Sequence, residues 1–368
     1  MTSRKTLSAI FVVVALLAAV LTYLAVARRH GSARPIGYPV AIAVPLGLPD
    51  VPIPADNPPT VETIALGRRL YYDTQLSLDR SISCASCHEP AAGFADPRPV
   101  SVGVGGKTGT RNSPPVANAA YYATQFWDGR APSLEKQAEG PVQNPVEMVH
   151  TLTGVEKRLN ADASYREQFA KAFGPRKITY EMVEKAIASF ERTVLMGNSP
   201  FDKWYFGHEE NAVSDSAKRG FDVFRRANKG NCASCHAFSD SSPLFTDNQF
   251  HNLGVGIGDD FMPKDLGRFT VTGIDADKGA FRTPTLRNVA LTAPYMHDGS
   301  LKTLKDVIDF YIGGGNSNPY RDPKMKELSY LTAQERKDVE EFLNSLTGEM
   351  PPDVGPSSVT RPVQHARR

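Results

Sequence analysis

The sequence has little cysteine, little tryptophan and almost no net charge. Lys and Arg number 42 against 40 Asp and Glu, which leaves a formal charge of +2 at pH 7. This near balance of charges gives no indication of a positively charged surface for nucleic acid or another polyanion. With 41% hydrophobic and 22% charged residues, the composition is typical of a globular protein rather than a disordered one. The 368 residues are enough for two domains, each with its own core.

Strict alternation of apolar and polar residues, which marks half-buried strands, is also scarce. Helical spacing is present instead. Between residues 178 and 195, apolar residues such as Val183 and Ile187 recur on one helical face. Thr332 and Glu335 form a capping-box signature that opens another amphipathic stretch. We therefore expect a mainly α fold.

All four cysteines lie in two copies of one motif, Cys-x-x-Cys-His. Two thiols at this spacing can each form a thioether with one haem vinyl group, and the adjacent histidine is then placed as an axial iron ligand. A four-cysteine zinc site, a redox dithiol and structural disulfides are the alternatives, but none of them requires the trailing histidine twice. We therefore expect two covalently attached haem c groups. Their attachment residues would be Cys84, Cys87 and His88 for the first and Cys232, Cys235 and His236 for the second.

A weak internal repeat surrounds the two motifs. A helix-like stretch at 65–71 precedes the first motif, and a similar stretch at 217–224 precedes the second. The same order of helix, loop and motif twice in one chain indicates two domains with one plan. We expect two cytochrome c-like domains, at residues 61–205 and 206–350, each carrying one haem c.

Both ends of the chain differ in composition from these domains. Residues 7–27 form an uncharged, mostly apolar run, which as a helix would extend about 30 Å and could cross a bilayer. We interpret residues 1–30 as a signal anchor or, alternatively, as a signal peptide cleaved after Ala27. Residues 31–60 are rich in proline and are expected to form an extended tether. Residues 351–368 are expected to form a disordered tail.

Several short segments carry a specific resemblance to a known family. They are Arg111–Pro114, Phe126–Arg130, Asn144–Met148, Pro284–Asn288 and Ala293–Gly299. From about Pro54 to Gly348 the chain resembles the bacterial di-haem cytochrome c peroxidases and their relative MauG. The resemblance implies that the N-terminal haem binds peroxide and that the C-terminal haem supplies electrons to it. It also implies a tryptophan and a calcium ion between the two haems.

The resemblance assigns catalytic roles to three side chains. Glu147 and Gln137 would lie in the distal pocket of the first haem. Cleavage of the O–O bond requires a proton moved from the inner to the outer peroxide oxygen, and a carboxylate beside the iron can move it. The alternatives are a surface carboxylate for Glu147 and an ordinary polar helix residue for Gln137. Trp127, one of two tryptophans, would be the aromatic relay between the haems, with core packing as its alternative role.

The resemblance also implies the ligands of the calcium ion. They would be the side-chain oxygen of Asn112 and the backbone carbonyls of Thr292 and Pro294. Calcium accepts such neutral oxygens together with water. A cation between the two domains would stiffen the geometry between the haems. The alternative for Asn112 is to cap the turn before Pro114.

Two features depart from the peroxidases and are similar to MauG. No histidine occurs between His88 and His150, where resting peroxidases carry a removable distal ligand. We therefore expect the first haem to be five-coordinate or water-bound. The distal ligand of the second haem, a methionine in the peroxidases, falls on Tyr311, and a tyrosinate favours higher oxidation states of iron. Met296 is the alternative ligand, and packing on an apolar helix face is the alternative role of Tyr311.

Together these patterns favour an enzyme that reduces hydrogen peroxide to water. Because c-type haem is attached on the exported side of the membrane, we expect the protein on the periplasmic side, anchored to the cytoplasmic membrane or soluble after cleavage. A c-type cytochrome or a cupredoxin would donate the electrons. One alternative is MauG-like, peroxide-dependent oxidation of aromatic residues in a partner protein. The other is a membrane-tethered di-haem electron carrier without enzymatic activity.

Overall fold

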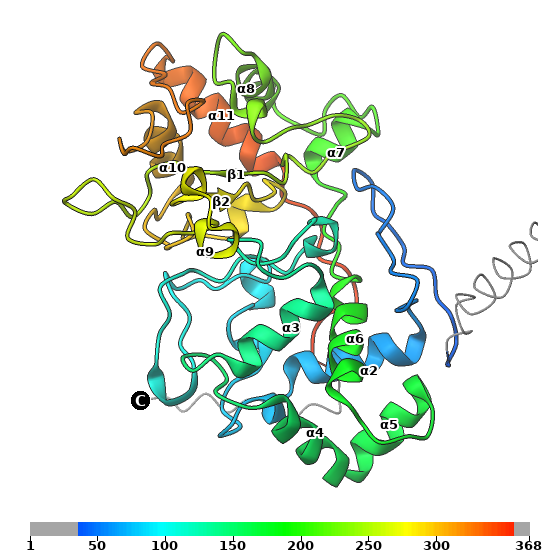
Figure 1. Cartoon of the computed structure of the whole chain (residues 1–368). Helices are drawn as coiled ribbons and strands as arrows, with labels where there is room; N and C mark the ends of the chain where they lie inside the picture. Colours follow the sequence, from blue (N-terminus) through cyan, green and yellow to red (C-terminus); the bar gives the residue numbers. More distant parts are fainter. Residues whose placement is uncertain (1–35, 357–368) are drawn as a thin grey trace, which may run out of the picture.

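The computed structural model describes residues 36–356, which form two mainly helical lobes (Figure 1). The signal anchor or signal peptide expected at residues 1–30 lies outside the described residues. Within residues 36–356 no helix is long and apolar enough to cross a membrane.

Helices account for most of the regular structure in both lobes, which confirms the mainly α fold. The α-helices are α2 (Val61–Tyr72), α3 (Leu134–Gln143), α4 (Leu152–Ala161), α5 (Ala163–Phe173), α6 (Tyr180–Glu191), α7 (Pro200–Tyr205), α8 (Asp215–Arg225), α9 (Phe269–Thr272), α10 (Leu304–Ile312) and α11 (Ala333–Ser345). Short 3₁₀ turns are η1 (Thr74–Leu76), η2 (Cys84–Ser86), η3 (Pro90–Ala92), η4 (Val104–Gly106), η5 (Ala119–Tyr121), η6 (Cys232–Ser234), η7 (Asp275–Asp277) and η8 (Val289–Leu291). Strands β1 (Phe250–His251) and β2 (Phe281–Arg282) form one antiparallel pair.

The same pair of packed helices occurs in each lobe. In the N-terminal lobe α2 packs on α6, and in the C-terminal lobe α8 packs on α11. One glycine permits each close approach: a Cβ added to Gly67 would overlap the carbonyl oxygen of Ala186, and one added to Gly220 would overlap that of Asp338. Both glycines belong to the helix-like stretches of the internal repeat. The repeat in the sequence therefore corresponds to a repeated helix packing in space.

Each lobe has its own hydrophobic core. In the N-terminal lobe, Leu70 of α2 and Val183 of α6 are fully buried. In the C-terminal lobe the core is aromatic, and Phe201 makes edge-to-face contacts with Phe221 and Phe342 at centroid distances of 5.1 and 5.6 Å. Such aromatic pairs contribute about 0.5–1.5 kcal/mol beyond their buried area.

The described part of the proline-rich segment, residues 36–60, is extended but is not a free tether. It runs beside both lobes, in blue in Figure 1. The backbone amide of Leu46 donates to Asn198 Oδ1 at 2.9 Å, and the hydroxyl of Tyr121 donates to the carbonyl of Pro49 at 2.7 Å. Proline composition indicates an extended backbone, but only the fold brings the partners that hold this segment.

The start of the expected disordered tail is also packed. Val354 is 5% exposed and contributes to a cluster that includes Tyr72 of α2. The hydroxyl of Tyr72 donates to the carbonyl of Val354 at 2.6 Å. The C-terminal end of the described chain therefore returns to the N-terminal lobe, and the prediction of disorder from residue 351 onward does not hold at Val354.

One ion pair of the C-terminal lobe is completely buried. Arg287 and Asp202 both have 0% exposed side chains, and their two N–O distances are 2.9 and 3.0 Å. The remaining donors of Arg287 reach the carbonyls of Pro243 and Gly47. The guanidinium thus joins α7 and the N-terminal segment to the rest of the C-terminal lobe. Within residues 36–356 Asp202 pairs with no other cation.

Candidate haem sites

The first motif forms a tight turn directly after the N-terminal helices. Cys84 begins the 3₁₀ turn η2, and the amide of His88 donates to the carbonyl of Cys84 at 3.0 Å. The hydroxyl of Tyr71 on α2 donates to the carbonyl of His88 at 3.1 Å. These bonds hold the motif against α2. Burial raises the pKa of the Cys84 thiol, which keeps the sulfur uncharged.

A cavity of about 910 Å³ opens beside His88. Its volume is within the range of about 300–1,000 Å³ that is usual for ligand and cofactor sites. Gln137, Glu147, Trp127 and Asn112 all line it. The structure therefore brings the three residues expected to be catalytic, and one expected calcium ligand, to one cavity with the first axial histidine.

Glu147 lies in this cavity wall just after α3. The side-chain amide of Asn144 donates to its Oε1 at 2.6 Å. Burial raises the pKa of Glu147, while the charge of Arg130 and the bond from Asn144 oppose this effect. A carboxyl group in this position can accept a proton when it is ionised and return it when it is protonated. The surface location considered as an alternative for Glu147 is therefore not what the structure shows.

Trp127 connects the two lobes at the edge of the same cavity. Its indole Nε1 donates to the backbone carbonyl of Asn112 at 2.8 Å. Its own carbonyl accepts from the backbone amide of Arg282, in the C-terminal lobe, at 2.8 Å. Arg111 makes a second connection, since it pairs with Asp265 of the C-terminal lobe at 2.6 Å. The side chain of Trp127 is thus held by its own lobe, and its backbone is hydrogen-bonded to the C-terminal lobe.

Three buried polar atoms of the cavity-lining residues have no hydrogen-bond partner within residues 36–356. They are Nδ1 of His88, Nη1 of Arg282 and Oε2 of Glu191. Arg282 is 2% exposed, and its guanidinium lies over the ring of Tyr122 at 3.4 Å. A buried, unpaired guanidinium is costly unless an anion accompanies it, and haem carries two carboxylates. Imidazole for the iron, two thiols for the vinyl groups and a cation for a carboxylate therefore fit haem.

The second motif repeats this arrangement in the C-terminal lobe. Cys232 begins the turn η6, and Nδ1 of His236 lies 3.1 Å from the carbonyl oxygen of Phe245. A bond from Nδ1–H to this carbonyl leaves Nε2 free as the iron ligand. The ring of His236 is therefore held in an orientation that fits the axial ligand expected from the sequence.

Tyr311 of α10 lies close to the second motif. Its phenol is buried, and burial raises its pKa, with smaller contributions from the thiols of Cys232 and Cys235. Met296 lies in a turn with a positive φ of 72°, and its carbonyl accepts from the amide of Gly299. Tyr311 as the distal ligand of the second haem stays a prediction.

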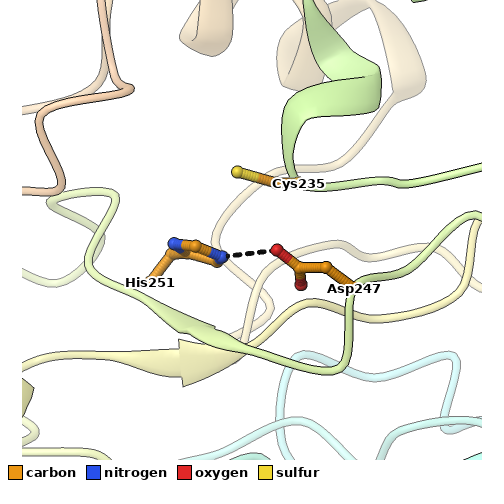
Figure 2. Close-up of side chains that lie close together, drawn as sticks. All are labelled: Cys235, Asp247 and His251. Carbon is orange, nitrogen blue, oxygen red and sulfur yellow. Dashed lines mark hydrogen bonds and ion pairs between the residues drawn. The ribbon is translucent and has the colours of Figure 1, made fainter.

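A histidine that the sequence analysis did not single out also lies beside the second motif (Figure 2). Nε2 of His251 is 2.9 Å from Asp247 and Nδ1 is 2.5 Å from Asp322. Contacts with Cys235 and these two carboxylates raise the pKa of His251 to about 10. The three side chains in Figure 2 lie within the reach of one metal ion, but a sulfur used in a thioether is a poor ligand. We therefore interpret His251 as an imidazole held between two carboxylates rather than as a metal ligand.

The expected calcium ligands lie where the two lobes meet. The backbone amide of Asn112 donates to the carbonyl of His297 at 2.7 Å, three residues beyond Pro294. The side-chain amide of Asn112 faces two carbonyl oxygens, those of Asp96 and Arg98, at 3.3 and 2.8 Å. Asn112 is buried, so it does more than cap a turn. The calcium ion itself stays a prediction.

Two Cys-x-x-Cys-His turns, each after a helix of the same packed pair, define a two-domain c-type cytochrome. The family model described as di-haem cytochrome c peroxidase matches residues 61–210, and the cytochrome c model matches residues 217–347. The chain belongs to the di-haem cytochrome c peroxidase and MauG family, a family of haem peroxidases. Two cytochrome c domains imply two haem c groups.

Two relatives and one solved structure illustrate the family. The methylamine utilization protein MauG of Methylorubrum extorquens is 40% identical over 313 residues, which are 85% of this chain and 84% of the relative. The cytochrome c551 peroxidase of Nitrosomonas europaea is 36% identical over 82% of this chain and 85% of the relative. The crystal structure of a MauG-like protein associated with microbial copper homeostasis superposes with a TM-score of 0.75 and 34% identity. It covers 83% of this chain and 95% of that chain. The family, the fold and the enzymatic class expected from the sequence are thus confirmed.

Proposed function

We propose that the protein reduces hydrogen peroxide to water at the N-terminal haem site, with electrons that pass through the C-terminal domain. The observation that supports this function best is the shared cavity of His88, Gln137 and Glu147. A haem bound there would supply an iron that takes up peroxide and electrons. The chain supplies a titratable carboxyl group, an amide and a tryptophan beside the space in which peroxide would bind.

The proposed role of Glu147 is proton transfer. Its carboxylate would take a proton from one oxygen of the peroxide and deliver it to the other, which would then leave as water. Asn144 holds one carboxylate oxygen at 2.6 Å, which fixes the side chain while the other oxygen exchanges the proton. Gln137 would orient peroxide by a hydrogen bond from α3.

The second domain would deliver electrons across the interface that Trp127 bridges. A calcium ion held by Asn112, Thr292 and Pro294 would keep the two lobes in register, because Asn112 already joins them through its amide. The electron donor would be a c-type cytochrome or a cupredoxin. We propose the periplasm as the location, since c-type haem is attached on that side of the membrane.

A second candidate function is the peroxide-dependent oxidation of aromatic residues in a partner protein. It is supported by the position of Tyr311, near Cys232 and Cys235, because a tyrosinate ligand favours oxidised iron rather than rapid electron donation. The relative from Methylorubrum extorquens carries the name MauG. Both candidates use peroxide at the first haem site.

Turnover with a reduced c-type cytochrome distinguishes the candidates. The first function predicts sustained consumption of peroxide, with two cytochrome molecules oxidised for each peroxide. The second predicts slow turnover with that cytochrome and oxidation of aromatic residues in an added partner protein. Inertness towards peroxide would contradict both and would leave an electron carrier.

Substitution of the two candidate ligands tests the coordination of the second haem. The oxidised holoprotein is expected to show one high-spin and one low-spin haem by electron paramagnetic resonance. In Tyr311→Phe the low-spin signal should disappear, or change in character if Met296 takes the position. In Met296→Leu it should stay nearly intact. Loss of the low-spin signal in Met296→Leu alone would assign the ligand to methionine and remove the main support for the second candidate function.

A further inference from the structure

Glu191, the last residue of α6, is a buried acid that the proposed mechanism does not use. It lines the cavity beside His88 and is 5% exposed. Within residues 36–356 its Oε2 is buried and has no hydrogen-bond partner. An ionised carboxylate that lacks a donor in such a place is strongly disfavoured. The protonated form is favoured instead, because its O–H can serve a group or a water in the cavity.

The groups that face Glu191 do not provide a cation that pairs with its carboxylate. Arg192, the residue directly after α6, pairs with Glu135 of α3 at 2.7 Å. The side chains of Cys84 and Tyr71, from η2 and α2, lie close enough to interact electrostatically with it but carry no positive charge. Burial raises the pKa of Glu191 to about 8, with Arg192 opposing and Glu135 adding to the effect. At pH 7 the Glu191 side chain is therefore neutral in most molecules.

We propose that Glu191 stores a proton at the wall of the first haem cavity and releases it when peroxide is reduced there. This inference rests on the proposed function. Reduction of hydrogen peroxide to two waters takes up two electrons and two protons, and Glu147 only moves a proton within the peroxide. One of the two net protons would come from the Glu191 carboxyl group, which becomes a carboxylate. Solvent then returns a proton to it, and the electrons come from the reduced donor.

The same helix offers a matched control. Glu184 is also buried on α6, at 3% exposed, but it pairs with Lys136 at 3.1 Å and is not among the residues that line the cavity. Glu184→Gln and Glu191→Gln make the same chemical change, and both keep the size of the side chain. Only the second removes a proton store from the cavity.

The reduction potential of the first haem, measured against pH in the holoprotein, tests the inference without peroxide. In the wild type it should be nearly constant below pH 8 and fall above it. There each electron taken up brings a proton to Glu191, and the electron affinity drops up to tenfold per pH unit. This change of slope near pH 8, here called the break, should be absent from Glu191→Gln and present in Glu184→Gln. A break that persists in Glu191→Gln, or is absent from the wild type, would overturn the inference.

Glu191→Asp covers the case in which Glu191→Gln does not bind haem. It keeps a carboxyl group, so its break should persist at a shifted pH. If neither variant binds haem, the wild-type titration alone decides. The proposed function is tested separately by peroxide turnover: a protein inert to peroxide that still shows the break contradicts the function and leaves the linkage at Glu191 intact.

Discussion

Glu147→Gln is expected to slow the reaction with hydrogen peroxide by roughly 10²–10⁴-fold, the usual contribution of a positioned proton-transfer group. The substitution keeps the size of the side chain and its bond with Asn144, but the amide cannot relay a proton. Burial raises the pKa of Glu147, and the reaction needs the ionised form as proton acceptor. The wild-type rate should therefore fall as the pH falls through this raised pKa. The slow rate of Glu147→Gln should not depend on pH in this range.

The measurement is stopped-flow spectroscopy of the holoprotein with peroxide. Glu139→Gln is the matched control, since Glu139 lies on the neighbouring helix α3, pairs with Lys136 at 2.7 Å and does not line the cavity. It should react at the wild-type rate. An undiminished rate in Glu147→Gln, with both haems attached, would show that another group moves the proton.

Arg287→Met is expected to destabilise the folded protein by about 3–5 kcal/mol, because it leaves a charge buried without its partner. Asp202 is completely buried and receives two hydrogen bonds from Arg287. The methionine fills similar space but donates nothing. It also releases the carbonyls of Pro243 and Gly47, so the N-terminal segment should loosen together with α7.

The midpoint of urea unfolding of the holoprotein, followed by circular dichroism, measures this loss. Adding Asp202→Leu to Arg287→Met should recover part of the stability, because removing both charges is far less costly than removing one. Lys171→Met, which breaks the exposed pair with Glu167, should change the stability by no more than about 0.5 kcal/mol. A midpoint in Arg287→Met equal to that of the wild type would mean that water or another cation compensates Asp202.

The chemistry of the haem sites was predictable because it depends on residues close together in the sequence. The spacing of Cys84, Cys87 and His88 is a covalent requirement, and the tight turn follows it. The capping box of Thr332 and Glu335 likewise predicted the start of α11, where Thr332 Oγ1 accepts from the amide of Glu335 at 3.2 Å. These predictions therefore depended only on interactions between residues that are close together in the sequence.

What the sequence could not indicate depends on partners far away in the chain. Residues 36–60 are extended, as their prolines require, but their attachment to Asn198 and Arg287 has no local signal. Glu191 resembles any helical glutamate in the sequence. Only the packing of α6 beside the cavity, with Arg192 paired to Glu135, makes it a buried acid whose Oε2 has no hydrogen-bond partner within residues 36–356. His251 similarly depends on Asp322, 71 residues away.

The return of the C-terminal end to the N-terminal lobe has a consequence for the order of folding. The bond between Tyr72 and Val354 spans 282 residues, so it closes almost the longest loop that the described chain contains. Contacts of such separation form late, because the chain entropy of the whole loop must be lost first. Most of the cluster around Tyr72 comes from the N-terminal lobe itself and can pack early, whereas Val354 can join it only after the chain has passed through the C-terminal lobe and returned.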